Sequence, residues 1–151
     1  MRGFAAVALD NTKNPENIGG VLRAAGIFGA SLVVISGNRI KKYMNHPTDT
    51  MKAYRTVPTV ITSDVFEALP YSCVPVAVDI LDGAVPLPDF KHPERAFYIF
   101  GPEDSTLGKR IVDRCPQSVI VPSSGSLNLA AAVNVVLYDR IAKWMKLQNN
   151  G

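Results

Sequence analysis

Short apolar runs alternate along the chain with stretches in which apolar residues recur every three or four positions. The runs predict strands at 4–9, 31–36, 59–62, 74–80, 96–100 and 118–121. Most of these runs are continuously apolar, which is typical of strands covered on both faces. The three-to-four spacing predicts helices at 15–28 and 127–147. The alternation favours an α/β fold with a mainly parallel sheet of about six strands flanked by helices.

Local signals mark where helices and loops begin and end. Gly29 follows the first predicted helix and can adopt the left-handed conformation that ends helices. Ser63 or Asp64 can cap a brief helix after the third strand. The stretch 81–94 contains three prolines, so we expect a surface loop there. No linker is indicated, and we expect one domain over residues 1–151.

The composition argues against several classes of protein. Hydrophobic residues make up 47% and charged residues 19% of the chain, as in ordinary globular proteins. No apolar run approaches the ~20 residues of a membrane span. Cys73 and Cys115 lack metal-ligand spacing and favour buried thiols in a reducing cytoplasm. His46 and His92 each precede a proline, which argues against a histidine metal site or a Ser–His–Asp triad, so we expect no metal ion.

The net charge of +3 conceals an uneven distribution of charged residues. Residues 1–59 contain eight Lys and Arg against three Asp and Glu, residues 60–104 two against eight, and residues 105–151 six against two. If the two ends of the chain meet in the fold, they form a basic face that attracts polyanions. A scatter of solvated charges is the alternative, and the sequence leaves both open.

The basic residues of the stretch 37–58 alternate with aromatic ones. Arg and Lys side chains bind phosphates and aromatic rings stack on bases, so this mixture suits RNA. A solvated loop with a short helix is the alternative. The basic residues are Arg39, Lys41, Lys42, Lys52 and Arg55, and the aromatic ones are Tyr43, His46 and Tyr54.

The start of the first predicted helix has the features of a binding site. Asn14 can serve as the N-cap, and Pro15 fits the first helical position. Gly19 and Gly20 each cost roughly 0.5–1 kcal/mol inside a helix, which indicates that something approaches the backbone closely. Arg23 leans back over these glycines, near a positive helix end that suits a phosphate. The alternative is that the glycines pack on the sheet and Arg23 is a solvated surface charge.

Two other strand ends carry unusual residues, at the edge where parallel sheets bind ligands. Gly101 and Glu103 follow the strand 96–100. Asp104 or Ser105 beside them can be explained as a helix cap. Capping does not explain Gly101 and Glu103, and a ligand bound close by is one reason for them. A Ser- and Gly-rich loop opens the last helix, and its alternative role is capping by Ser126.

Three motifs that follow one another in the chain carry a resemblance to a known family. They are Asn-Pro-Glu-Asn-Ile-Gly-Gly-Val-Leu-Arg at 14–23, Phe-Gly-Pro-Glu at 100–103 with Leu107, and Ser-Leu-Asn-Leu at 126–129. In this order they resemble the motifs of the SpoU (TrmH-like) branch of the SPOUT RNA methyltransferases, in its minimal single-domain form. The resemblance implies an α/β fold whose C-terminal part threads a deep trefoil knot, usually in a homodimer. It also implies methylation of a ribose 2'-hydroxyl of tRNA or rRNA with S-adenosylmethionine, without a separate RNA-binding extension.

The resemblance also assigns roles to individual residues. Family proposals cast Arg23 as the base, but a guanidinium does not readily give up its proton. We therefore expect Arg23 to clamp a phosphate and the developing alkoxide, while Asn17 and Ser126 position the ribose hydroxyl. Glu103 is expected to orient its neighbours, and Asn128 to hold cofactor or substrate near the reaction centre. The expected RNA contacts are Lys41, Lys42, Lys52 and Arg55. The expected lining of the cofactor pocket is Val78, Gly101, Val121, Ser126, Leu127 and Leu129.

Two departures from the family pattern keep other functions open. Thr106 stands where most members have glycine, and the loop 122–126 is shorter than in most members. One alternative is a cofactor- or RNA-binding protein of the same fold that has lost methyl transfer. Another is a Rossmann-like nucleotide-binding enzyme, which the absence of a glycine fingerprint disfavours.

Overall fold

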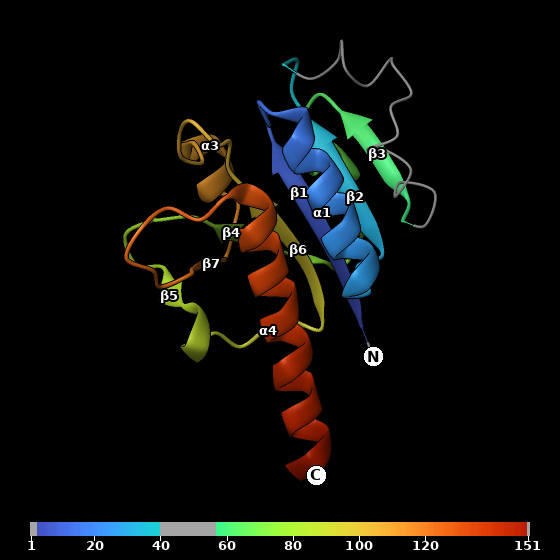
Figure 1. Cartoon of the computed structure of the whole chain (residues 1–151), viewed down its shortest axis with the longest axis vertical. Coiled ribbons are helices and arrows are strands. Elements are labelled where there is room, and N and C mark those ends of the chain that lie inside the picture. The colour runs from blue at the N-terminus through green and yellow to red at the C-terminus, as the bar shows by residue number, and fades with distance from the viewer. Residues whose placement is uncertain (1–2, 40–56, 151) are drawn as a thin grey trace.

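A parallel sheet positions every other element of the molecule. The structure is a computed structural model, and it describes residues 3–39 and 57–150. Within these residues seven strands lie in the order β3-β2-β1-β6-β4-β7-β5, and every neighbouring pair is parallel (Figure 1). Their bounds are β1 Phe4–Asp10, β2 Leu32–Ser36, β3 Thr59–Thr62, β4 Val74–Val78, β5 Val85–Pro86, β6 Arg95–Phe100 and β7 Gln117–Ile120.

Six of these strands confirm the predicted apolar runs, with ends that differ by no more than two residues. The seventh, β5, lies in the stretch 81–94, where we expected only a loop. That expectation was wrong for Val85 and Pro86, which pair with Val119 and Ile120 of β7. Two residues are too few to form a recognisable apolar run, and proline is tolerated because β5 is an edge strand.

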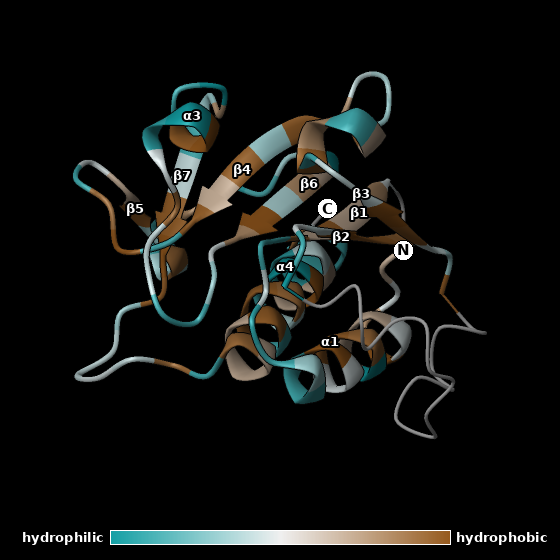
Figure 2. Ribbon diagram, turned by 90° about the horizontal axis from the view of Figure 1, so that it is seen from above, coloured by the Kyte–Doolittle hydropathy of each residue, from teal (hydrophilic) through white to brown (hydrophobic). Residues whose placement is uncertain are grey.

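Helices cover both faces of the sheet. Figure 2 shows α1 and α4 together on one face and α3 on the other. The predicted brief helix after β3 is confirmed as a 3-10 turn, η2, which the Asp64 side chain caps by accepting from the N–H of Phe66. The bounds are α1 Pro15–Ile27, η2 Val65–Ala68, η3 Leu87–Asp89, α3 Lys109–Val112 and α4 Leu129–Asn150.

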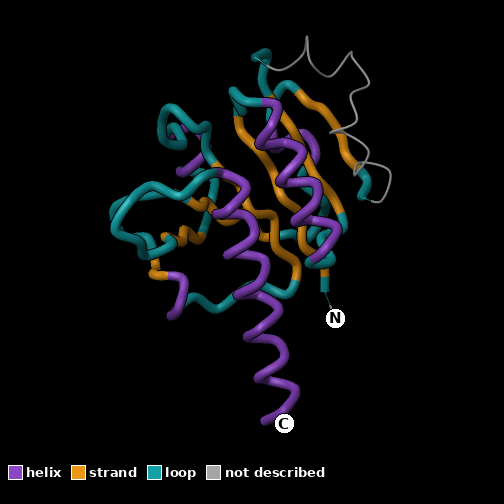
Figure 3. Tube along the Cα trace, in the orientation of Figure 1, coloured by secondary structure: helices purple, strands orange, loops and turns teal. Residues whose placement is uncertain are grey.

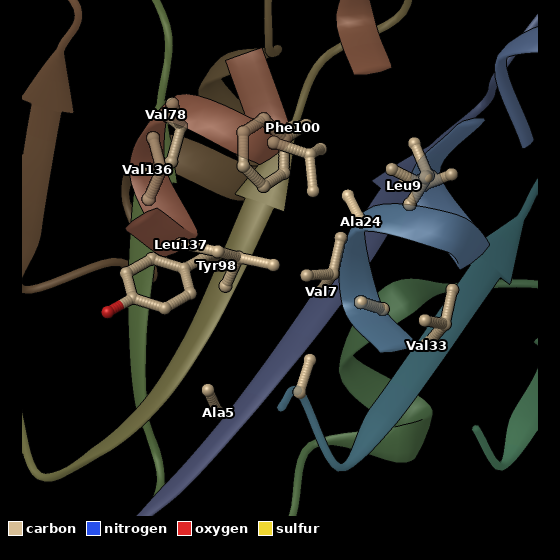
Figure 4. Packing of buried hydrophobic residues seen from close by; sticks show 14 of the residues in the cluster. Ala5, Val7, Leu9, Ala24, Val33, Val78, Tyr98, Phe100, Val136 and Leu137 are labelled. Atoms are coloured by element: carbon tan, nitrogen blue, oxygen red, sulfur yellow. The ribbon is translucent and has the colours of Figure 1, made fainter. Parts of the chain in front are cut away.

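The core consists of two apolar layers, one on each face of the sheet. Side chains alternate along β1, so Val7 and Leu9 face α1 and α4, whereas Ala6 and Ala8 face the layer of η2 and α3. Figure 4 shows the first layer, in which Tyr98 of β6 lies near Leu137 of α4. Burial on both faces explains why the central strands β1, β2 and β6 read as continuous apolar runs.

Both predicted ends of the first helix are confirmed. The Asn14 side chain accepts a hydrogen bond from the backbone N–H of Glu16, and Pro15 occupies the first position. Gly29 follows the helix with φ of 71°, and the N–H of Ala30 reaches back to the carbonyl of Ala25 at 2.9 Å. A left-handed glycine with this bond is a common way for a helix to end.

Gly20 allows α1 and α4 to pack closely. A Cβ atom at Gly20 would lie 2.8 Å from the Cβ of Ala130. The predicted close approach is therefore explained, at Gly20, by another helix rather than by the sheet or by a phosphate. The contact places the beginning of α4 beside α1.

We expect Gly20→Ala to destabilise the protein even though alanine is the better helix former. Overpacking costs about 1–3 kcal/mol, whereas the gain in helix propensity is about 1 kcal/mol. Urea unfolding should show a lower midpoint, and adding Ala130→Gly should recover part of the loss. A Gly20→Ala variant more stable than the wild type would contradict the close packing.

Candidate functional site

A cleft of ≈ 900 Å³ lies at the carboxyl ends of β1, β6, β4 and β7, which are neighbours in the sheet. Its walls come from parts of the segments that follow these strands, within 13–17, 78–80, 100–106 and 120–129. Figure 3 traces the last of these as the long teal loop from β7 to the first turn of α4. Parallel α/β sheets bind their ligands at this edge.

The carboxylate of Glu103 joins the loop before α1 to the loop after β6. It accepts hydrogen bonds from the backbone N–H groups of Lys13 (2.9 Å) and Asn14 (3.0 Å) and from the side-chain amide of Asn17 (2.7 Å). Burial raises the pKa of Glu103, but these hydrogen bonds outweigh burial and hold its pKa below the usual range. Glu103 is therefore ionised at neutral pH.

The amide of Asn17 extends this interaction to α4. Its Nδ2 donates to Glu103, while its Oδ1 accepts from Nδ2 of Asn128 at 3.0 Å. The Oδ1 of Asn128 accepts from the backbone N–H groups of Ala130 (2.9 Å) and Ala131 (3.3 Å). The donor and the acceptor of each of these hydrogen bonds are fixed. At one end the ionised carboxylate of Glu103 only accepts, and at the other the backbone N–H groups of Ala130 and Ala131 only donate. We call Glu103, Asn17 and Asn128 the amide network.

Asn128 is the residue that caps α4, so the alternative of a cap at Ser126 was wrong. The helix begins at Leu129, two residues later than predicted, and the Asn128 side chain meets its first N–H groups. Ser126 is instead exposed and lines the cleft. Its hydroxyl makes no hydrogen bond to any residue that the structure describes.

Asp79, which we did not predict from the sequence, holds the loop after β6. Its Oδ2 accepts from the backbone N–H of Leu107, and its Oδ1 accepts from that of Ile80, both at 2.7 Å. A Cβ on Gly101 would lie 3.1 Å from Asp79 Oδ2 and 3.2 Å from the Leu107 nitrogen, which is tighter than side chains usually pack. Glycine at 101 therefore lets this bond form. The available signal was an acid directly after a strand, at its carboxyl end.

Asp104 and Ser105 do not cap a helix, contrary to the alternative considered for them. The next helix, α3, begins only at Lys109 and has Gly108 at its cap position without a side-chain hydrogen bond. Asp104 forms an ion pair with Arg39 instead, at 2.8 Å. A tertiary partner has therefore prevailed over the local capping preference.

The cleft brings together most of the predicted site residues. Its lining includes the expected cofactor residues Val78, Gly101, Val121, Ser126, Leu127 and Leu129, and the expected catalytic residues Asn17, Glu103, Ser126 and Asn128. Thr106, which departs from the family pattern, lines it as well. The expected RNA contacts Lys41, Lys42, Lys52 and Arg55 lie outside the described residues.

Arg23 is the predicted catalytic residue that does not line the cleft. It is exposed on α1, whereas Asn17 on the same helix is buried. The two residues lie six positions apart, which separates them by roughly 120° around the helix axis. Within its own chain Arg23 is therefore a solvated surface charge, which was the alternative to a phosphate-binding role.

His92 lies in a buried polar network away from the cleft. Its Nδ1 is 2.7 Å from the Tyr98 hydroxyl, and its Nε2 is 2.7 Å from the Asp139 carboxylate. Lys143, one turn further along α4, contacts the same carboxylate at 2.8 Å. Burial lowers the pKa of His92. This network joins α4 to the segment before β6.

The described residues contain neither a cluster of metal ligands nor a helix suited to cross a membrane. No group of three or more His, Cys, Asp and Glu side chains is placed there to hold a metal ion. Cys73 and Cys115 are free thiols, and burial raises the pKa of Cys115 to about 11. None of the helices in 3–39 and 57–150 combines the length and apolar composition that a membrane crossing requires.

Known proteins resemble the chain over nearly its whole length. The family model of the SpoU rRNA Methylase family matches residues 5–138. The tRNA (cytidine/uridine/adenosine-2'-O-)-methyltransferase TrmJ of Pseudomonas aeruginosa is 32% identical, over 94% of this chain and 62% of TrmJ. Among solved structures, the SpoU methyltransferase AviRb of Streptomyces viridochromogenes in complex with AdoMet has a TM-score of 0.79 at 22% identity, over 97% of this chain and 62% of AviRb.

A second solved structure matches more evenly in length. It is described as giving structural insights into the 2-OH methylation of C/U34 on tRNA, and it has a TM-score of 0.75 at 23% identity over 96% of this chain and 93% of its own. Similarity at these identities shows that the α/β fold is shared. With the family match over most of the residues, it follows that the chain belongs to the SpoU rRNA methylase family.

We expect Asn128→Asp to disrupt the amide network while sparing the helix cap. The new carboxylate can still accept from Ala130 and Ala131, but it cannot donate to Asn17. A lost hydrogen bond costs about 0.5–1.5 kcal/mol, and an anion at the helix start recovers about 0.3–1 kcal/mol. Thermal unfolding should therefore change little, while the NMR signals of the Asn17 side-chain amide shift.

Asn128→Ala is the matched control, because it removes both the cap and the donor. It should lower the stability by about 1.5–2.5 kcal/mol, because the usual cost of losing a cap, about 1 kcal/mol, adds to that of the lost hydrogen bond. Unchanged Asn17 amide signals in Asn128→Asp would contradict the network.

Proposed function

We propose that the protein is an S-adenosylmethionine-dependent methyltransferase that modifies a ribose 2'-hydroxyl of tRNA or rRNA. The observation that carries the proposal is the amide network, which joins one residue from each of the three motifs at one cleft. The names of the relatives support the reaction, because TrmJ is a tRNA 2'-O-methyltransferase and AviRb is described in complex with AdoMet.

The cleft fits this cofactor in size and in chemistry. Its ≈ 900 Å³ lies within the range of small-molecule and cofactor sites. Its apolar side chains suit an adenine ring, and the strand-end loops offer backbone N–H and C=O groups. When bound, the cofactor supplies a methyl group on a sulfonium. The residues proposed to hold it are Val78, Gly101, Val121, Ser126, Leu127 and Leu129.

The amide network is proposed to orient groups rather than to react. Asn17 is buried, with its amide engaged by Glu103 at one end and by Asn128 at the other, so it holds the two loops in register. Ser126 has an exposed hydroxyl and is the residue suited to position the ribose hydroxyl. Holding the attacking oxygen in line with a methyl group is the main task of such a site.

We also propose a homodimer in which Arg23 of one protomer reaches the cleft of its partner. Arg23 lies one turn before Ile27, which is 66% exposed, so both share a face of α1. Tyr138 of α4 is 60% exposed, and its ring lies 6.0 Å from that of Phe28 at the end of α1. Exposed apolar side chains gathered in this way favour a protein interface. Arg23 would then clamp a substrate phosphate and the developing alkoxide.

The knot, the RNA contacts and the cytoplasmic location are also proposals. The segment 79–94 leaves β4, pairs with β7 through β5 and passes α4, where Lys143 donates to the carbonyls of Leu87 and Phe90. A segment crossed in this way by the last helix supports the expected trefoil knot. The basic residues of 40–56 would supply RNA contacts, because Lys and Arg bind phosphates.

The proposal predicts binding of S-adenosylhomocysteine and transfer of a labelled methyl group. Calorimetry should give one site per chain, and incubation with total tRNA and rRNA should label a ribose, which protects the adjoining phosphodiester from alkaline cleavage. Absence of binding would refute the cofactor assignment. Binding without transfer to any RNA would favour the alternative of a binding protein of the same fold.

Arg23→Ala should abolish transfer and leave S-adenosylhomocysteine binding near normal, because Arg23 does not line the cleft of its own chain. Glu103→Ala should also be inactive. A heterodimer of these two variants, isolated through two affinity tags, should regain about half of the wild-type activity, since one of its two clefts has every residue intact. An inactive heterodimer would instead assign Arg23 to its own cleft, and an active Arg23→Ala homodimer would show that Arg23 has no role in transfer.

A further inference from the structure

Arg39 joins two loops at the edge of the cleft. Its Nη1 and Nη2 donate to the two carboxylate oxygens of Asp104, at 2.8 and 3.0 Å. Its Nη2 also donates to the backbone carbonyl of Asn11 at 2.7 Å. A planar guanidinium can make this two-pronged contact and bridge to a third acceptor, whereas a lysine ammonium cannot reproduce the geometry.

The segment that begins at Asn11 is held tightly at its start. Asn11 itself has φ of 54°, in the left-handed region that most residues avoid. A Cβ on Gly37 would lie 2.6 Å from the Asn11 Oδ1, so the chain after β2 passes directly against this turn. Arg39 follows two residues later and contacts the carbonyl of the same Asn11.

The two loops are joined a second time through the neighbouring acid. Glu103 accepts directly from the N–H groups of Lys13 and Asn14, while Asp104 acts through Arg39 on Asn11. Two adjacent carboxylates therefore hold the segment 11–14 from both ends. Asn17 lies three residues beyond this segment, so the position of the segment sets the position of Asn17 in the amide network.

We propose that Arg39 is a positioning residue, which keeps the segment 11–14 against Glu103 and so keeps the amide network aligned. Its consequence for catalysis rests on the proposed function. A direct contact of Arg39 with RNA phosphate is the competing role, which the basic stretch in the sequence favoured. The positioning role is better supported, because both terminal nitrogens of Arg39 already donate within the chain.

The test compares Arg39→Gln with Arg110→Gln. The control also removes the ion pairs of an exposed arginine, with Asp64 and, at 3.9 Å, with Asp10, but Arg110 lies on α3, does not line the cleft and makes no hydrogen bond to the segment 11–14 within the described residues. NMR measures how fast the backbone N–H groups of Lys13 and Asn14 exchange with solvent. Arg39→Gln should speed both exchanges about tenfold, as loss of a charge-assisted bond predicts, and Arg110→Gln should leave them unchanged. With RNA, Arg39→Gln should lower kcat about tenfold and leave the KM for S-adenosylmethionine within about twofold.

Further variants make the test decisive. Arg39→Lys, which keeps the charge without the fork, should give a smaller increase in exchange, and it replaces Arg39→Gln if that variant fails to fold. In the double variant Asp104→Asn/Arg39→Gln, the N–H groups of Lys13 and Asn14 should exchange no faster than in the more affected single variant. Both substitutions remove the same contact. Additive effects would overturn the proposal.

The remaining outcomes separate this inference from the proposed function. Unchanged exchange at Lys13 and Asn14 in Arg39→Gln would overturn the positioning role. Weaker RNA binding with unchanged exchange would likewise overturn it and assign Arg39 to RNA contact. A wild-type protein that neither binds S-adenosylhomocysteine nor methylates RNA would refute the function, and the exchange rates would still decide the role of Arg39.

Discussion

The hydrogen bonds from Glu103 through Asn17 to Asn128 are the interaction on which the cleft depends. They connect loops that follow β1, β6 and β7, whose sequence positions span more than a hundred residues. The sheet brings the strand ends together, but strand pairing does not fix the conformations of the loops that follow them. The amide network removes this freedom, because each amide has only one orientation that satisfies both of its neighbours.

The network in turn requires that the first turns of α1 and α4 lie close together. Asn17 lies in the first turn of α1, and Asn128 caps α4. The near contact of Gly20 with Ala130 allows the two helix starts to come close enough for these amides to meet. A glycine that costs helix stability is therefore explained by the distance it permits between two helices, and through that distance by the site.

The sequence predicted the parts of the structure that local physics decides. Continuous apolar runs identified the long strands, and Asn14 and Gly29 marked both ends of α1, because burial and capping leave signatures within a few residues. The predictions that were wrong concern residues whose conformation or partner is decided by a residue far away in the sequence. Asp104 has a capping side chain but pairs with Arg39, and Asn128 rather than Ser126 caps α4, where it also meets Asn17. β5 was missed because its pairing with β7 needs no apolar run.

Arg23 does not line the cleft of its own chain, so its proposed role depends on the proposed homodimer. Its motif begins at the residue that caps α1 and includes Asn17 of the amide network, yet the arginine at its end is exposed on another face of the helix. In the proposed homodimer, the two ends of this motif would serve two neighbouring clefts. The exposed Ile27 and Tyr138 nearby provide an apolar surface on which a second copy could bring them together. In that arrangement α1 would face its own cleft through Asn17 and its partner's cleft through Arg23.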